Sequence, residues 1–274
     1  MSNLFGVVRR SVLQLSIASS LIAAPAAALS LFNPTVLVTI DGLPVGTLSC
    51  GPLGFVCDEL GIATLVEDLT FTSLTGDSVT LNRLLPDGTP FMLDPDPQIV
   101  YSSTITDIGA PSTFSFVFSQ AIVATAAPGL ADHTMSSNTT DGSTNGAPVT
   151  AAAAPFGVPV DPDGIPEIAK YTLSTNGGVT LVSAAFDLGP SFVAATGSTS
   201  QGPYVEGGSG PLGAGSYNFM RVDVNVTLGG GGDRYAFNGR ASIVEDVVVP
   251  EPGTGALVAL GFVALAVRRR SRAA

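Results

Sequence analysis

His133 is the only histidine in this 274-residue chain, and it lies within Ala131-Asp132-His133-Thr134. A serine or cysteine nucleophile needs such a base beside it, together with an orienting acid. The chain has no G-x-S-x-G turn, and one histidine cannot supply the usual ligand set of a zinc enzyme. We therefore predict no catalytic residue and interpret His133 as a loop histidine without a chemical role.

Paired carboxylates are the remaining way in which this chain could perform hydrolysis. A glycosidase needs two carboxyl groups about 5–10 Å apart in a cleft. Five glutamates precede Glu251, namely Glu59, Glu67, Glu167, Glu206 and Glu245. Because the sequence brings no two of them together, a polysaccharide hydrolase is the third of our functional hypotheses.

Calcium is the metal that the acidic turns would suit best. Ca²⁺ prefers hard carboxylate oxygens gathered in turns, and residues 94–97 and 161–167 are two such acidic segments. Neither segment matches the D-x-[DN]-x-[DN]-G loop. Asp-Pro and Asp-Gly are also ordinary turn dipeptides. We predict no cofactor and keep Ca²⁺ as an open alternative. Its candidate ligands are Asp94, Asp96, Asp161, Asp163 and Glu167.

Alternating strands are the elements that would have to position any such site. In residues 113–119 three phenylalanines share one face, and in residues 221–228 four aliphatic side chains do so. Many short segments of this kind, separated by Gly, Pro and Asp-Gly turns, predict an all-β fold, an antiparallel β-sandwich or jelly roll. A short helix over residues 59–69 is the one helical element considered for this domain.

Two stretches look too poor in large apolar residues to form packed structure. Residues 127–165 are dominated by Ala, Thr, Ser, Gly, Asn and Pro, and residues 196–216 are rich in Gly and Ser. Such segments bury little surface to offset the entropy of ordering. We predict loose surface loops in both places.

Residues 1–28 have the pattern of a secretory signal peptide. Arg9 and Arg10 precede a short apolar stretch, and A-x-A-like cleavage sites follow between Ala24 and Ala28. We predict export through the Sec translocon and removal by signal peptidase; an N-terminal membrane anchor is the alternative.

The C-terminal segment 250–274 combines three features in a fixed order. Pro250-Glu251-Pro252 cannot join a helix or a central strand, because proline lacks a backbone N–H. A run of 15 apolar or small residues from Gly253 to Val267 would form a helix of roughly 22 Å, short for a bilayer core of about 30 Å. A cluster of basic residues then fixes this end on the cytoplasmic side: Arg268, Arg269, Arg270 and Arg272.

This order resembles the PEP-CTERM sorting signal of exopolysaccharide-producing Gram-negative bacteria. Members often carry a Leu pair early in the helix, where this chain has Ala256-Leu257. The resemblance implies that an exosortase reads the tail in the inner membrane and cleaves near the P-E-P motif. A plain membrane anchor and the apolar end of a soluble domain are the alternatives.

Charge and cysteines agree with export. Residues 29–249 hold five basic and 21 acidic residues, a net charge of −16, which nucleic acid and anionic membranes would repel. Cys50 and Cys57 flank a Gly/Pro-containing loop, and in an exported chain so close a pair predicts a disulfide; a metal or redox pair is the alternative.

These observations lead to one main hypothesis for residues 29–249. We expect an exported, non-enzymatic structural or adhesive protein of the cell surface or extracellular polysaccharide matrix. The alternative is a carbohydrate-binding jelly roll, with or without a bound calcium ion.

Overall fold

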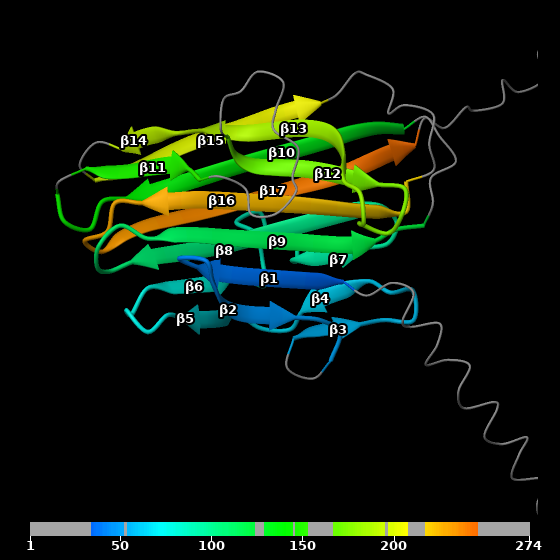
Figure 1. Ribbon diagram of the computed structural model, residues 1–274, viewed down its shortest axis with the longest axis horizontal. Helices are drawn as coiled ribbons and strands as arrows, with labels where there is room; N and C mark the ends of the chain where they lie inside the picture. Colours follow the sequence, from blue (N-terminus) through cyan, green and yellow to red (C-terminus); the bar gives the residue numbers. More distant parts are fainter. Residues whose placement is uncertain are drawn as a thin grey trace, which may run out of the picture.

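The computed structural model describes the central part of the chain and shows strands as its only regular elements there (Figure 1). The described residues are 34–51, 54–123, 129–144, 146–152, 167–194, 197–207 and 217–245. The signal peptide 1–28 and the sorting segment 250–274 lie outside them. The predicted all-β antiparallel class is confirmed.

The first sheet, sheet A, has eight strands in the order β13-β12-β16-β9-β1-β2, with β11 paired to β16 and β14 paired to β11. Its members are β1 (Thr35–Ile40), β2 (Leu43–Leu48), β9 (Thr113–Ala121), β11 (Ala147–Ala151), β12 (Glu167–Ser174), β13 (Val182–Pro190), β14 (Phe192–Ala194) and β16 (Phe219–Leu228).

The second sheet, sheet B, has nine strands in the order β15-β10-β17-β8-β7-β4-β3, with β6 paired to β8 and β5 paired to β6. Its members are β3 (Phe55–Cys57), β4 (Ala63–Leu65), β5 (Leu69–Thr72), β6 (Ser78–Leu81), β7 (Met92–Asp94), β8 (Gln98–Asp107), β10 (Gly129–Thr140), β15 (Ser198–Gly207) and β17 (Asp233–Glu245).

The two strands with the clearest alternation lie side by side in sheet A. In β9 the side chains of Phe114, Phe116 and Phe118 are fully buried, as the pattern predicts. In β16 the predicted apolar face is also buried, and it consists of Val222, Val224, Val226 and Leu228. Period-two alternation identified both strands because each has one face against the other sheet.

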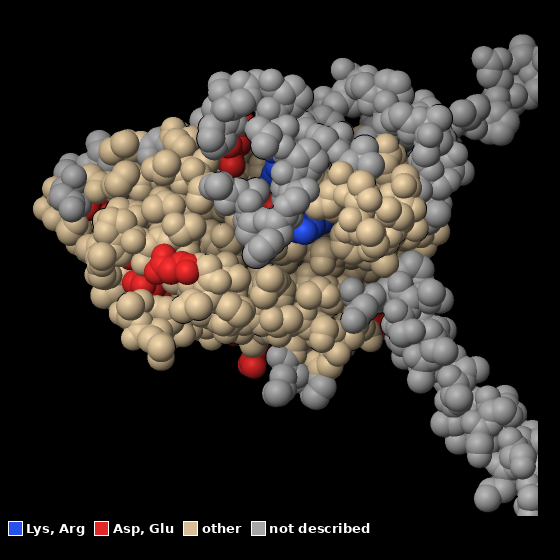
Figure 2. Space-filling view, viewed as in Figure 1, with Lys and Arg blue, Asp and Glu red and all other residues tan. Residues whose placement is uncertain are grey.

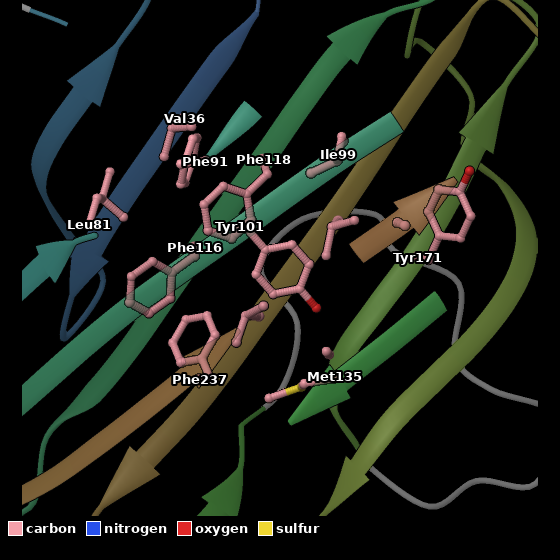
Figure 3. Packing of buried hydrophobic residues seen from close by; sticks show 14 of the residues in the cluster. Val36, Leu81, Phe91, Ile99, Tyr101, Phe116, Phe118, Met135, Tyr171 and Phe237 are labelled. Carbon is pink, nitrogen blue, oxygen red and sulfur yellow. The ribbon is translucent and has the colours of Figure 1, made fainter. Parts of the chain in front are cut away.

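An aromatic layer joins the two sheets across the core (Figure 3). Phe118 of β9 stacks on Tyr101 of β8 with ring centroids 5.1 Å apart, and Phe116 meets Phe237 of β17 edge-on at 5.0 Å. Phe91 extends the layer, because its centroid lies 5.9 Å from that of Phe118. Such ring pairs add stabilisation beyond the burial of their area.

Glycine at position 239 makes room for the polar part of this layer. Gly239 of β17 lies opposite Tyr101 in the ladder, and a Cβ there would collide with the Tyr101 hydroxyl and the Thr134 carbonyl oxygen. With no side chain in the way, the Tyr101 hydroxyl crosses β17 and lies 2.8 Å from His133 Nε2 on β10. His133 is therefore a fully buried core residue, and its assignment to a loop is wrong.

The expected loose loop over 127–165 is wrong for residues 129–140 and 147–151, which form β10 and β11. Strand β10 is central in sheet B and pairs with β17 along its whole length and with β15 on its other side. Its buried face has one large apolar side chain, Met135, among small or polar ones and so shows no apolar alternation: Ala131, His133, Met135, Ser137 and Thr139. Pairing on both sides overrides the weak composition, because strand preference depends on context.

Two further predictions, a loose loop over residues 196–216 and a short helix over residues 59–69, are wrong where these residues pair as strands. Residues 198–207, within the second expected loop, form β15 against β10. The short helix considered for residues 59–69 is absent; β4 occupies residues 63–65, and β5 begins at Leu69.

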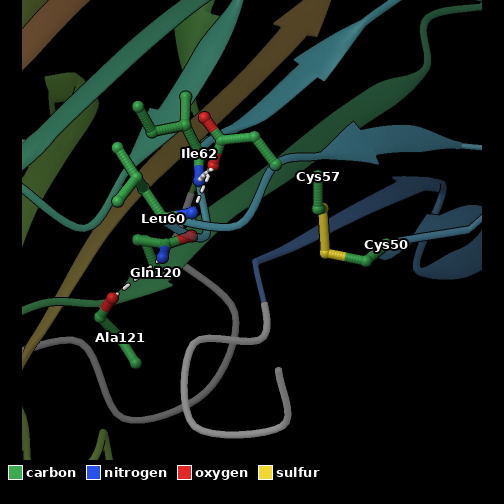
Figure 4. Close-up of a disulfide and its surroundings, with 7 residues drawn as sticks. Cys50, Cys57, Leu60, Ile62, Gln120 and Ala121 are labelled. Carbon is green, nitrogen blue, oxygen red and sulfur yellow. Dashed lines mark hydrogen bonds between the residues drawn. A yellow bond between two sulfur atoms is a disulfide. The ribbon is translucent and has the colours of Figure 1, made fainter. Parts of the chain in front are cut away.

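The predicted disulfide joins Cys50 and Cys57, whose Cα atoms are 5.6 Å apart (Figure 4). It links the end of the β1–β2 hairpin in sheet A to β3 in sheet B. The bridge therefore ties the two sheets at one edge of the sandwich.

Replacing Gly239 by alanine should destabilise the domain. The new methyl group collides with a side chain and a backbone carbonyl inside a packed core, which should lower the free energy of unfolding by about 1–3 kcal/mol. Gly109→Ala is the matched control, because a Cβ there meets nothing within 4 Å. Denaturant unfolding measures both variants, and equal stability of the two would contradict this packing.

Removal of the disulfide should cost about 2 kcal/mol, since the bridge closes a loop with a sequence separation of 7 residues. Urea unfolding of the Cys50→Ala/Cys57→Ala double variant against the oxidised protein gives this value. A stability equal to that of the oxidised parent would mean that the bridge restrains nothing.

Candidate functional site

All the residues predicted to act in sorting lie outside the described part of the chain. These are Pro250, Glu251 and Pro252, together with Arg268, Arg269, Arg270 and Arg272. Strand β17 ends at Glu245, so the described sandwich stops five residues before Pro250. The chemistry of the described residues must therefore be sought within the sandwich.

The contact between His133 and Tyr101 is a buried polar bridge between strands. Both residues have no exposed surface, and the Tyr171 ring meets the imidazole edge-on at 5.9 Å. Burial raises the pKa of Tyr101 and so keeps its hydroxyl neutral. Because a substrate cannot touch these side chains, the bridge serves the core of the sandwich.

The structure separates the predicted calcium ligands. Asp94 and Asp96 lie at the β7–β8 turn of sheet B, where Asp94 Oδ1 accepts a 2.9 Å hydrogen bond from the Asp96 amide. Glu167 begins β12 of sheet A. Asp161 and Asp163 lie outside the described residues. Burial raises the pKa of Asp94, and the charges of Asp96 and Asp58 add to this effect.

Within the described ranges, no group of three or more His, Cys, Asp or Glu side chains has an arrangement that would hold a metal ion. Calcium binding by the five residues named from the sequence therefore stays a prediction.

A group of buried carboxylates that the sequence did not reveal lies where several turns meet. Asp107 ends β8 and Asp233 begins β17, and the two residues are directly opposite in the ladder. Asp77 lies just before β6, and Asp141 just after β10. Asp77, Asp107 and Asp233 are 1% exposed or less, and Asp141 is 9% exposed.

Two of these carboxylates accept hydrogen bonds from backbone amides and so stabilise the turns around them. Asp77 Oδ1 accepts from the Ile108 amide at 2.9 Å, and its Oδ2 accepts from the Thr75 hydroxyl at 2.6 Å. Asp141 accepts from three amides of its own turn, those of Ser143, Thr144 and Gly146. Hydrogen bonds of this kind stabilise the charged form.

Asp107 and Asp233 are less well supplied with donors. Asp107 Oδ2 accepts from the Ser112 amide at 3.1 Å, and Asp233 Oδ1 accepts from the Gly142 amide at 3.2 Å. Burial, together with the charges of Asp77 and Asp233, raises the pKa of Asp107 to about 6, against the opposing effect of the Ser112 and Gly230 amides. Since neither carboxylate has exposed surface, a sugar ring cannot reach this pair for hydrolysis.

The outer face of sheet A carries a second set of buried polar groups. Arg221 Nε donates to Asp223 Oδ2 at 2.8 Å, and Lys170 of β12 is the register partner of Asp223. Burial raises the pKa of Asp223 to about 6, against the opposing effects of Arg221 and Lys170. Asn225 lies next on this face and is 2% exposed. We expected this side of β16 to be the polar one, but not that Asp223 and Asn225 would be buried.

The surface in view in Figure 2 is mostly uncharged, with acidic side chains as separate spots. An open hollow of about 560 Å³ lies between the β4–β5 and β6–β7 connections, lined by Val66, Glu67, Asp68, Asn82, Arg83 and Leu84. Asp68 closes its floor by accepting a 2.7 Å hydrogen bond from the Arg83 amide.

Comparison with family models decides the role of the C-terminal segment. Residues 248–270 match the PEP-CTERM protein-sorting motif. This chain therefore carries a PEP-CTERM sorting motif at residues 248–270. The match contains Pro250-Glu251-Pro252 and the first three arginines of the basic cluster. The resemblance seen in the sequence is thereby confirmed.

The other comparisons add little to this motif match. No curated protein matches it. A solved structure, "Structure of infectious bursal disease virus Gx strain", is 12% identical over 88% of this chain and 70% of that chain, with a TM-score of 0.14. At such a score the likeness carries no structural argument.

The PEP-CTERM motif implies an exported protein that passes the membrane and is processed by an exosortase. Within the described part of the chain, no helix has the length and hydrophobicity of a membrane span. The expected apolar helix of residues 253–267 lies outside that part.

The thermal stability of the exported protein should fall as pH rises from 5 to 7.5 in EDTA. A carboxyl group with a raised pKa in the folded state stabilises that state fully below its unfolded pKa of 3.8, and this contribution is lost as pH rises through about 6. Asp107 and Asp223 both act in this direction. Asp77 and Asp87 have lowered pKa values, so their contributions are lost only at more acidic pH.

Asp107→Asn should flatten this pH dependence and raise the melting temperature at pH 7.5. Asp87→Asn, which changes an exposed turn residue, is the control and should leave the slope unchanged. Melting curves at several pH values test both; a slope in Asp107→Asn as steep as that of the parent would contradict the assignment.

Sorting can be tested by intact mass spectrometry of the protein from surface, medium and membrane fractions of its own host. We expect loss of both ends, with a new C-terminus near Pro250–Pro252. A variant with Ala-Ala-Ala in place of Pro-Glu-Pro should keep Arg268–Ala274 and stay in the membrane fraction. An uncut parent protein in the membrane would mean that the tail is a simple anchor.

Proposed function

We propose that this protein is a non-enzymatic structural or adhesive component of the cell surface or extracellular polysaccharide matrix of a Gram-negative bacterium. The observation that carries the proposal is the position of the sorting motif relative to the sandwich. Strand β17 lies between β10 and β8 and ends at Glu245, and the motif match begins at residue 248.

This short separation limits how far the sandwich can lie from its point of processing. Four residues lie between Glu245 and Pro250, and a fully extended chain spans about 17 Å over the five steps that join these two residues. A domain held on so short a connection would stay close to whatever its new C-terminus joins. That arrangement suits a surface component better than a freely diffusing enzyme.

The packed sandwich also supports a load-bearing role outside the cell. Its last strand is central in sheet B, and the disulfide ties the two sheets at one edge. A disulfide persists in oxidising, extracytoplasmic surroundings. The acidic domain would remain soluble and would not bind nucleic acid.

The proposal is tested by deleting the coding sequence in the host and restoring it with the parent or the Ala-Ala-Ala sorting variant. We expect the deletion and the sorting variant to weaken cell adhesion or matrix cohesion, and the parent to restore it. The purified protein should release no sugar from the host polysaccharide. Release at enzymatic rates, or full adhesion in the deletion strain, would overturn the proposal.

A carbohydrate-binding module is the second candidate, favoured by the polar groups on the outer face of sheet A. On the outward side of β16 the Arg221 side chain is 18% exposed, and a guanidinium group can donate to sugar hydroxyls, whereas Asp223 and Asn225 beside it are buried. Against it, Tyr101, Tyr171 and Tyr235 are fully buried and offer no stacking surface.

Glycan-array binding separates the two candidates. Binding that is lost in Arg221→Gln, and in EDTA if calcium takes part, would favour the module. Failure to bind any glycan at every calcium concentration would eliminate it.

A further inference from the structure

Three turns of the sandwich approach one another closely around Asp107 and Asp233. The Gly232 amide donates to the Asp107 carbonyl at 2.7 Å, and the Gly231 amide donates to the Gly109 carbonyl at 3.0 Å. A Cβ at Gly142 would collide with the Gly232 backbone. The β8–β9, β10–β11 and β16–β17 turns therefore meet backbone to backbone, and glycine permits it.

Two carboxylates of like charge face each other beneath these turns. Asp107 and Asp233 are a directly opposed cross-strand pair, so their side chains share one face and their Cβ atoms are about 4.5–5.5 Å apart. Like charges in such a position are destabilising. No exposed surface lets water screen either of them.

One oxygen of each carboxylate lacks a hydrogen-bond donor. Asp107 Oδ1 and Asp233 Oδ2 are buried and receive no hydrogen bond from any donor in the part of the chain that the structure describes. Their other oxygens are occupied by the Ser112 and Gly142 amides. A buried carboxylate oxygen without a partner is costly, which makes each of the two a vacant acceptor.

The charges around the pair are negative as well. Asp77 and Asp233 act on Asp107, and Asp141 acts on Asp233. A Cβ at Gly229 would lie 3.0 Å from Asp233 Oδ2 and closer still to the Pro148 ring, so the Gly229 backbone and Pro148 lie beside this oxygen. Carboxylate oxygens and backbone carbonyl oxygens are the ligand types that Ca²⁺ takes in turns.

We propose that Asp107 Oδ1 and Asp233 Oδ2 are the side-chain ligands of a divalent-cation site of the calcium type, completed by backbone oxygens of the adjoining turns and by water. The cation would neutralise the opposed charges and satisfy both vacant oxygens. It would also clamp β8 to β17 at the end where three turns meet.

The ligand set predicts weak binding. The described residues contain no group of three acidic, His or Cys side chains arranged around a metal, so only two charged ligands are available here. Calcium sites with few charged ligands have dissociation constants of about 10⁻⁴–10⁻³ M, as in extracellular modules. This fits an exported protein, but the site does not depend on an adhesive role.

The test compares melting curves of the exported protein, purified from its host, in EDTA and in 10 mM CaCl₂ at pH 7.5. With calcium at about ten times the dissociation constant, the melting temperature should rise by about 3–6 °C. Isothermal titration with CaCl₂ should give one site per chain.

Asp107→Asn and Asp233→Asn should each lose most of the calcium-dependent rise. Since each substitution removes one of two opposed charges, we expect both variants to fold and to melt higher than the parent in EDTA. The double variant Asp94→Asn/Asp96→Asn is the matched control, and it should keep the full rise.

Three results would overturn the proposal. One is a parent protein that neither binds nor responds to calcium. Another is an undiminished response in both Asp107→Asn and Asp233→Asn. The last is loss of the response in the Asp94→Asn/Asp96→Asn control alone.

Discussion

The stacking of Phe118 on Tyr101 is the contact on which the rest of this sandwich depends. Phe118 comes from β9 in sheet A and Tyr101 from β8 in sheet B, and their rings lie 5.1 Å apart. Through Tyr101 the same contact reaches His133 on β10, and through Phe116 it reaches Phe237 on β17. Both sheets are thus held on one aromatic layer, which a tryptophan-free chain builds from Phe and Tyr.

Around this layer the burial of polar groups is uneven. His133 and Tyr101 satisfy each other in the centre of the core. At the end of the sandwich Asp77 and Asp141 are supplied with backbone donors, whereas Asp107 and Asp233 each keep a vacant oxygen. Burying a carboxylate oxygen without a hydrogen-bond donor is costly. The shortage of donors at the two opposed carboxylates therefore supports a bound ligand at that end of the sandwich.

Sequence reasoning found the features whose signal is local. The strands at β9 and β16 have one large apolar face, so alternation identified them. The Cys50–Cys57 bridge spans a short loop, and the sorting motif is contiguous. Each of these can be recognised without knowing which segments meet in space.

The features that were missed depend on pairing between distant segments. Strand β10 has His133 and Thr139 on its buried face, and only its place between β15 and β17 makes it a strand. Asp107 and Asp233 meet because β8 pairs with β17 across more than a hundred residues. The only local hint was an aspartate beside a glycine turn at each position, a pattern that ordinary turns share.

Amide hydrogen exchange of the exported protein, followed by mass spectrometry, tests most directly whether one aromatic layer holds both sheets together. Core strands that unfold only with the whole domain exchange slowest. The account predicts that peptides covering β8, β9, β10 and β17 are protected to a similar, high degree. Rapid exchange of residues 129–140, at the rate of the exposed β5–β6 turn, would contradict it, because β10 would then be the loose loop that its composition suggests.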